Sequence, residues 1–160
     1  MSLPGVRKKT DTNRRSRPSK RIASEIRKLT CGQVMLAAHE VDEMDSIDDV
    51  VRLIAAKDWD HVMVTDEVGS LVGRVHAVDL LKLIMSKRIN RDLFWMEAVP
   101  ILQAVSQPPL QVNTTTPLMV AATLMLTHDL NQIAITDTHG VLVGYVSHAV
   151  VARHLPRFLL

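Results

Sequence analysis

Two stretches of the chain share one pattern: V-M-V-T-D-E-V-G-S-L-V-G-R-V-H-A-V-D at Val62–Asp79 and I-A-I-T-D-T-H-G-V-L-V-G-Y-V-S-H-A-V at Ile133–Val150. They align without a gap at a constant offset of 71 residues. Each stretch predicts a short apolar strand, a turn built on Asp and Gly, a second apolar strand and the start of a helix. The chain therefore carries an internal duplication.

An amphipathic helix is predicted ahead of each stretch, and a short strand ahead of that helix. The apolar positions of the two helices recur at helical spacing and at the same offset: Ile47, Val50, Val51 and Ile54, then Leu118, Ala121, Ala122 and Met125. Each copy is therefore a β-α-β-β-α unit with one sheet face left to cover. We expect an α/β (α+β) fold in which two such repeats pack face to face about a pseudo-twofold axis.

The sequence outside the repeats predicts two further helices and a polar arm. The N-terminal arm is rich in charged residues, Pro, Ser and Thr, and it has too few apolar residues to form a core. The predicted organisation is a basic flexible arm at 1–19, an N-terminal helix at 20–32, repeat 1 at 33–88, a connecting helix at 89–107 and repeat 2 at 108–160.

Charge is distributed unevenly along the chain. Residues 1–28 carry ten basic and two acidic side chains, a net charge of +8, whereas the remainder carries nine basic and fifteen acidic side chains, a net of −6. The basic residues between 7 and 28 could hold a polyanion such as nucleic acid or an anionic membrane face. The other interpretation is a solvated arm that lies against the acidic body of its own chain or of a partner chain. Both interpretations stay open.

Composition favours a cytoplasmic protein without a membrane span. The 160 residues are 47% hydrophobic, which is ordinary for a globular protein. The longest uncharged apolar run, Leu118–Leu126, is about half the roughly 20 residues that a bilayer requires. The N-terminus has no apolar segment typical of a signal peptide. A single cysteine, Cys31, excludes an internal disulfide framework and suits a reducing compartment.

Catalytic and metal-binding motifs are not found. The seven histidines have no H-E-x-x-H spacing, Cys31 has no nucleophile context, and no glycine-rich phosphate loop occurs. We therefore expect that the protein is not an enzyme, with no catalytic residue, no resident cofactor and no metal site.

The string V-T-D-x-x-G-x-L-V-G-x-V, present twice, resembles the cystathionine β-synthase (CBS) domain, and the tandem pair resembles a Bateman module. The resemblance covers about Gln33–Leu155. It implies frequent dimerisation into a flat disk of four repeats. It also implies regulatory binding of AMP, ADP, ATP or S-adenosylmethionine in clefts between the repeats.

The family's ligand motif is Gly-x-hydrophobic-Thr/Ser-x-x-Asp at the end of the second hairpin strand. The first copy keeps the acid, Asp79, but has His76 at the hydroxyl position. The second copy keeps the hydroxyl, Ser147, but has Val150 in place of the acid. Asp79 could accept hydrogen bonds from a ribose or simply place charge in the first helical turn. Ser147 could contact a ligand or simply cap its helix.

Other candidate contacts follow from strand alternation and from the resemblance. Arg74 lies on the same strand face as His76 and could meet phosphate oxygens, whereas Tyr145 is expected beside Ser147 in the second cleft. The family usually has a proline in the first hairpin strand, where this chain has Met63 and Ala134. The backbone positions that could meet an adenine edge are Val62, Met63, Ile133 and Ala134.

Two functions are consistent with the sequence. The first is a regulatory module that binds an adenosine-containing ligand, with the cleft that carries Asp79 as the better equipped of the two. The alternative is a degenerate CBS pair that serves as a dimerisation or docking scaffold, with the basic arm contacting nucleic acid or another polyanion. In either case a homodimer is expected.

Overall fold

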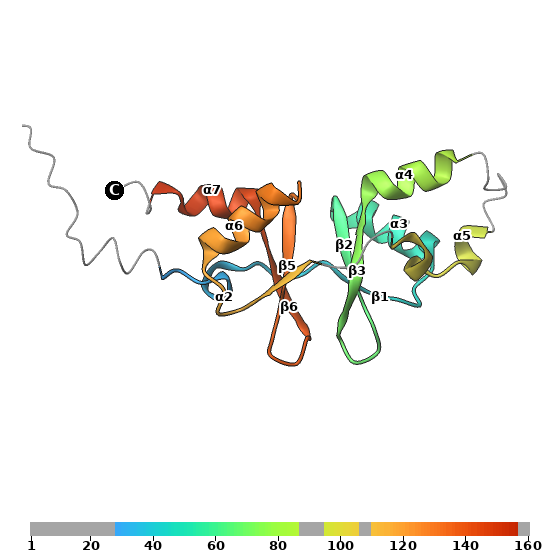
Figure 1. The fold of residues 1–160 in the computed structure, drawn as a ribbon. Helices are drawn as coiled ribbons and strands as arrows, with labels where there is room; N and C mark the ends of the chain where they lie inside the picture. Colours follow the sequence, from blue (N-terminus) through green and yellow to red (C-terminus); the bar gives the residue numbers. More distant parts are fainter. Residues whose placement is uncertain (1–27, 87–94, 106–109, 157–160) are drawn as a thin grey trace, which may run out of the picture.

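The computed structural model of the protein describes residues 28–86, 95–105 and 110–156. Within them, both copies of the repeat form the predicted β-α-β-β-α order (Figure 1). The first copy consists of β1 (Glu40–Asp42), α3 (Ile47–Lys57), β2 (His61–Thr65), β3 (Leu71–His76) and α4 (Ala77–Met85). The second consists of β4 (Gln111–Asn113), α6 (Leu118–Thr127), β5 (Gln132–Thr136), β6 (Leu142–Ser147) and α7 (His148–His154).

Each repeat is built on a mixed three-stranded sheet. The central strand, β2 or β5, pairs in parallel with β1 or β4 and antiparallel with β3 or β6. Both central strands are buried at every position. In β2, Val62 and Val64 join the core of their own repeat, whereas Met63 contacts the other repeat. The alternation of side chains thus divides the central strand between two apolar environments.

The predicted capping and turn residues explain why the elements begin and end where they do. Ser46 caps α3, because its Oγ accepts a hydrogen bond from the Asp49 N–H at 3.1 Å. Both hairpin turns need a left-handed residue, and Gly69 (φ 85°) and Gly140 (φ 81°) supply it. In the first turn the Asp66 carboxylate accepts hydrogen bonds from two backbone N–H groups that follow it.

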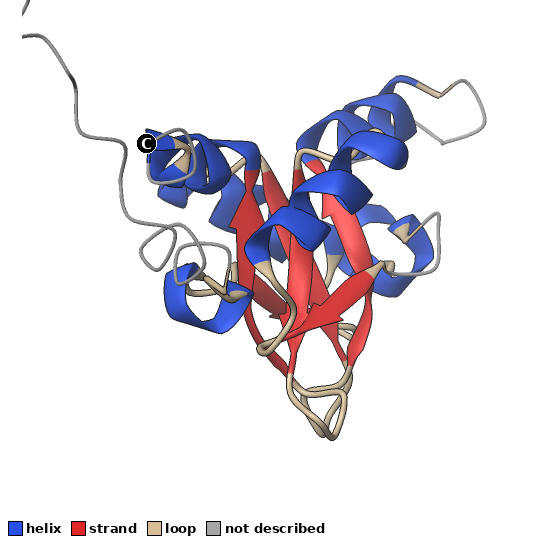
Figure 2. Cartoon of the chain, turned by 60° about the vertical axis from the view of Figure 1, so that its left-hand side comes forward, coloured by secondary structure: helices blue, strands red, loops and turns tan. Residues whose placement is uncertain are grey.

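The two repeats face each other across their sheets, with the helices on the outside (Figures 1 and 2). Met63, Ala134 and Leu142 form a small buried cluster between the sheets. The hairpin turns also touch, since the Leu142 N–H donates to the Gly69 carbonyl at 3.0 Å. The α/β architecture with a face-to-face pair of repeats is therefore confirmed.

Short segments ahead of β1 and β4 dock on the opposite repeat, and we call them the leaders (residues 29–36 and 99–105). The first contains α2 (Cys31–Val34) and packs in the core of the second repeat. The other contains η1 (Ile101–Ala104), a 3₁₀ helix, and packs in the core of the first repeat.

Equivalent backbone hydrogen bonds hold the two leaders. In the first leader, the Cys31 N–H donates to Thr116 O and the Gly32 N–H donates to Thr114 O, both at 2.8 Å. In the second leader, the Ile101 N–H donates to Asp45 O at 2.7 Å, and the Leu102 N–H donates to Glu43 O at 3.2 Å. The leader residues correspond at an offset of 70, whereas the residues that receive them correspond at 71. The leaders therefore belong to the duplicated unit.

The helix predicted over residues 20–32 lies mostly outside the described residues, and its described end was wrongly predicted. Thr30 is extended (φ −97°, ψ 158°), and the four-residue α2 begins after it. The Thr30 N–H donates to Gln33 Oε1 at 2.9 Å, an arrangement that starts a helix rather than ending one. Gly32 consequently lies inside α2 instead of stopping a longer helix.

The single connecting helix predicted over 89–107 is also wrong in its described part. Residues 89–94 and 106–107 lie outside the described ranges, and the rest forms α5 (Trp95–Ala98) and then η1. Pro100 separates the two helices with an extended backbone (φ −68°, ψ 148°). Proline has no N–H to donate and disfavours a helical conformation at the residue before it, which explains the break.

The glycines of the return strands allow the leaders to approach closely. A β-carbon at Gly73 would collide with the Val105 side chain of one leader. A β-carbon at Gly144 would lie 2.7 Å from the Leu36 carbonyl oxygen and 2.8 Å from the Met35 sulfur of the other leader. Among the described residues, no helix combines the length and apolar content needed to cross a bilayer.

Candidate functional site

The first ligand motif lies where β3 ends and α4 begins. His76 is the last residue of β3 and pairs in register with His61, the first residue of β2. Asp79, one turn into α4, accepts a hydrogen bond from the His76 N–H at 3.1 Å. The carboxylate predicted to hold a ribose therefore has a capping role in the structure.

Aromatic rings from both repeats pack around His61. The His39 ring, which precedes β1, stacks on Trp59 with centroids 4.1 Å apart and on His61 at 4.8 Å. Tyr145 reaches across from β6 of the second repeat and lies 5.2 Å from His61, edge to face. His76 completes this histidine cluster (His39, His61 and His76), with its centroid 6.4 Å from that of His61.

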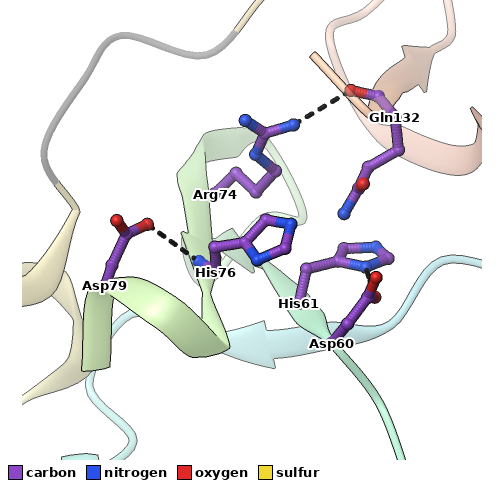
Figure 3. A network of polar contacts seen from close by, with 6 residues as sticks. All are labelled: Asp60, His61, Arg74, His76, Asp79 and Gln132. Carbon is purple, nitrogen blue, oxygen red and sulfur yellow. Dashed lines mark hydrogen bonds and ion pairs between the residues drawn. The ribbon is translucent and has the colours of Figure 1, made fainter. Parts of the chain in front are cut away.

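Arg74 reaches from β3 to the second repeat (Figure 3). Its Nη1 donates to the backbone carbonyl of Gln132 at 3.0 Å. Burial lowers the pKa of Arg74, and the carboxylates of Asp79 and Asp60 oppose that shift. No ion pair of Arg74 occurs within the described ranges. A half-buried guanidinium is thus held between the repeats by a neutral oxygen.

Asp60 and His61 form the clearest electrostatic pair of the site. His61 Nδ1 lies 2.7 Å from Asp60 Oδ1. This hydrogen bond lowers the pKa of Asp60. Burial lowers the pKa of His61, and its effect exceeds the opposing effect of Asp60. The His61 ring is therefore neutral at pH 7, with Nδ1 as the donor to Asp60 and Nε2 as an acceptor.

Four buried side-chain nitrogens near this point have no hydrogen-bond partner. They are His39 Nδ1, His61 Nε2, His76 Nε2 and Gln132 Nε2, and within the described part of the chain no other buried side-chain nitrogen or oxygen lacks a partner. Figure 3 shows the Gln132 amide beside the His61 ring. Because buried polar groups are normally paired, their concentration here marks a place where a ligand or ordered water would be stabilised.

The residues predicted for the second cleft do not gather in the same way. Ser147 caps α7 by accepting a hydrogen bond from the Val150 N–H at 3.3 Å. Tyr145 was predicted to lie beside Ser147, but its ring packs on His39 and His61 instead. The assignment of Ser147 and Tyr145 to a second ligand cleft stays a prediction.

The four predicted backbone positions are all buried. Val62 and Ile133 point into the cores of their own repeats, whereas Met63 and Ala134 meet between the repeats. The Met63 N–H already donates to the His39 carbonyl at 2.7 Å. A contact of these positions with an adenine edge stays a prediction.

Sequence reasoning missed His39, Trp59, Asp60, His61 and Gln132. One signal was present, because His61 and Gln132 are polar residues at equivalent positions that begin otherwise apolar strands. Within the described ranges, including this site, no group of three His, Cys, Asp or Glu side chains is arranged to hold a metal ion.

Comparison with known protein families agrees with this architecture. A family model for the CBS domain matches residues 37–86 and 101–157, more than half of the chain. The chain belongs to the CBS-domain family. The second matched segment begins at Ile101, inside the leader that docks on the first repeat. A search of curated proteins finds no significant match.

Solved CBS-domain structures share the fold. CBSX2 in complex with AMP is 26% identical, with a TM-score of 0.69 over 82% of this chain and 98% of that one. A CBS domain-containing protein from Bacillus anthracis is 13% identical, with a TM-score of 0.73 over 84% and 97% of the two chains. The CBS domain of a bacterial CNNM/CorC family Mg²⁺ transporter in complex with ATP is 15% identical, with a TM-score of 0.68 over 86% and 94%.

Proposed function

We propose that the protein is a regulatory module that binds an adenosine-containing ligand (AMP, ADP, ATP or S-adenosylmethionine) between its repeats, at the site that carries Asp79. The observation that carries this proposal is the set of unpartnered buried nitrogens on His39, His61, His76 and Gln132. They come from both repeats and lie beside the half-buried guanidinium of Arg74. CBSX2 and the CNNM/CorC domain, which share the fold, are described with AMP and ATP.

Each residue has a role that suits its chemistry. Arg74 donates to phosphate oxygens, and the unpartnered ring nitrogen of His76 takes the place of the family's hydroxyl. Asp79 uses one oxygen on the His76 N–H, and a carboxylate retains further lone pairs for ribose hydroxyls. In this proposal the protein acts by binding rather than by catalysis.

Ligand binding would alter contacts between the repeats. The Arg74 bond to the Gln132 carbonyl and the Tyr145 contact with His61 both cross from one repeat to the other. A ligand phosphate that accepts a hydrogen bond from Arg74 would compete with the Gln132 carbonyl for the guanidinium. Binding thus favours a different arrangement of the two repeats, which a partner could detect.

The test is a thermal-shift and calorimetric titration with AMP, ADP, ATP and S-adenosylmethionine. A ligand at about 100 times its Kd should stabilise the fold by about 2.7 kcal/mol. Asp79→Ala should abolish the shift. Ser147→Ala is the matched control, because it also removes a capping interaction but leaves the first site intact. Absence of a shift with all four ligands at millimolar concentration would reject the proposal.

A second candidate function is a dimerisation scaffold, and one surface favours it. The outer face of α4 exposes four apolar side chains: Val78, Leu81, Ile84 and Met85. A second copy of the chain would bury this face and give the expected homodimer. The basic residues between 7 and 28 would then contact a polyanion, although positions 7–27 lie outside the described residues. Loss of a salt-dependent nucleic-acid affinity on deleting residues 1–20 would support this function.

A further inference from the structure

The charges around the histidine cluster do not suit an anionic ligand by themselves. The groups that face His61 and His76 are Asp60 before β2, Asp79 on α4, Arg74 on β3, His39 before β1 and, from the second repeat, Tyr145 and Gln132. Apart from the imidazoles, this set holds two carboxylates and one guanidinium. A phosphate dianion would add negative charge to a group that already has a net charge of −1.

The hydrogen bond to Asp60 also fixes what His61 can offer a ligand. Because Nδ1 of the neutral ring donates to Asp60, the unpartnered Nε2 carries a lone pair. Phosphate oxygens are acceptors as well, so they repel this nitrogen. A proton on Nε2 would convert it into a donor and would give the imidazolium an anion on each side.

We infer that the site selects a phosphate-bearing ligand over an uncharged nucleoside and binds it together with a proton, with His61 as the residue that takes up the proton. This inference rests on the proposed function. Phosphate and proton each favour the other: the anion stabilises the imidazolium, and the imidazolium supplies a second cation beside Arg74. Binding is therefore tighter at mildly acidic pH, in the range where histidine titrates.

The empty site disfavours the same proton. Burial lowers the pKa of His61 despite the adjacent carboxylate of Asp60, and the imidazoles of His39 and His76 lie nearby. The neutral empty state and the protonated bound state thus differ by one proton. This difference makes ligand affinity depend on pH.

Isothermal calorimetry of the full chain with AMP and with adenosine, between about pH 6 and pH 8, tests the inference. Titrations in buffers of different ionisation enthalpy count the protons taken up. We expect AMP to bind with net proton uptake and to weaken by up to about tenfold per pH unit as the pH rises. Adenosine should bind more weakly and without proton uptake.

His61→Gln is the decisive variant, because the second repeat carries Gln132 at the equivalent buried strand position. Free AMP titrates near pH 6, and this free-ligand contribution is the same for wild type and variant, so their difference reports the complex. We expect His61→Gln to bind AMP with less proton uptake and a flatter pH profile. His139→Gln, which changes an exposed histidine in the hairpin turn of the second repeat, should behave as wild type.

Asp60→Asn provides a second variant that should fold, since the Asp60 side chain is 70% exposed. It keeps an acceptor for Nδ1 but removes the charge that stabilises the imidazolium, so proton uptake should decrease. Equal proton uptake and equal pH profiles for wild type, His61→Gln and Asp60→Asn would overturn the inference and leave the proposed function intact. Adenosine binding as tightly as AMP would overturn the selection for phosphate. Failure of AMP, ADP, ATP and S-adenosylmethionine to bind at any pH would overturn both proposals.

Discussion

At the scale of the residue, His61 lies at the first position of a fully buried strand, where an apolar side chain would pack without cost. The residue is 2% exposed, and among the described residues its ring has only the Asp60 carboxylate as a hydrogen-bond partner. A buried group whose pKa is lowered in the fold links the stability of the fold to the proton concentration.

The first of three predictions concerns the pH dependence of stability without ligand. Because the pKa of His61 is lowered in the fold, the unfolded chain binds more protons than the folded protein below the unfolded value of 6.5. The free energy of unfolding should therefore fall as the pH drops through 6.5. Urea titrations at several pH values should show this loss in wild type and a smaller loss in His61→Gln. An equal loss in both proteins would contradict the prediction.

Asp60 acts in a different pH range. Its pKa is lowered in the fold, so its contribution is present above the unfolded value, about 3.9, and is lost below it. Measurements between about pH 5 and 8 therefore report histidine rather than Asp60.

At the scale of the element, each return strand accommodates a leader at a glycine. Gly73 has no β-carbon where the Val105 side chain of the second leader packs, and Gly144 leaves room for Met35 and Leu36 of the first. The same strand position thus has the same packing role in both repeats.

The second prediction tests this contact with a double-mutant cycle. Gly73→Ala should destabilise the protein by about 1–3 kcal/mol, because the new methyl group collides with Val105. Val105→Ala should cost about 1 kcal/mol by itself. In the Val105→Ala background, Gly73→Ala should cost much less, so the double mutant is more stable than the sum of the single changes predicts. Additive changes in the free energy of unfolding would show that the two residues do not touch.

The elements that could be predicted from the sequence are those whose signals are local. The alternation of Val62–Thr65, the Asp–Gly turns and the stripe of α3 fix strands, hairpins and helices without reference to distant residues. The leaders could not be predicted, because their hydrogen bonds join segments far apart in the sequence and their offset differs by one residue. Pro100 was a visible helix breaker whose effect was underestimated.

The site was predictable only where the ligand motif lies. Strand alternation placed Arg74 and His76 on one face of β3, and they do lie together. His39 and His61 come from other segments of the same repeat, and their stacking depends on the parallel pairing of β1 with β2. The Tyr145 ring reaches His39 and His61 from the other repeat, a contact that depends on how the two repeats meet.

At the scale of the whole molecule, neither repeat completes its core alone. Ile101 precedes the second repeat in the chain but is fully buried in the core of the first. Cys31 precedes the first repeat but is fully buried in the core of the second. The two repeats should therefore unfold as one cooperative unit.

The third prediction concerns assembly through α4. Leu81, which is 60% exposed, is the most central residue of the apolar face. If a second copy covers this face, Leu81→Lys should convert a dimer into a monomer in size-exclusion chromatography with light scattering. The monomeric variant should keep its circular dichroism spectrum, since the side chain makes no core contact. A wild-type protein that elutes as a monomer would contradict the predicted homodimer.

The exchanged leaders also bear on how such a chain could have arisen. A gene that encoded one leader and one repeat would produce a protein without an opposite repeat on which its leader could dock as the leaders do here. Two such proteins would satisfy each other by swapping leaders, as in a domain-swapped dimer. Duplication and fusion would then join two subunits that already depended on each other, after which one ligand motif could keep its acid and the other its hydroxyl.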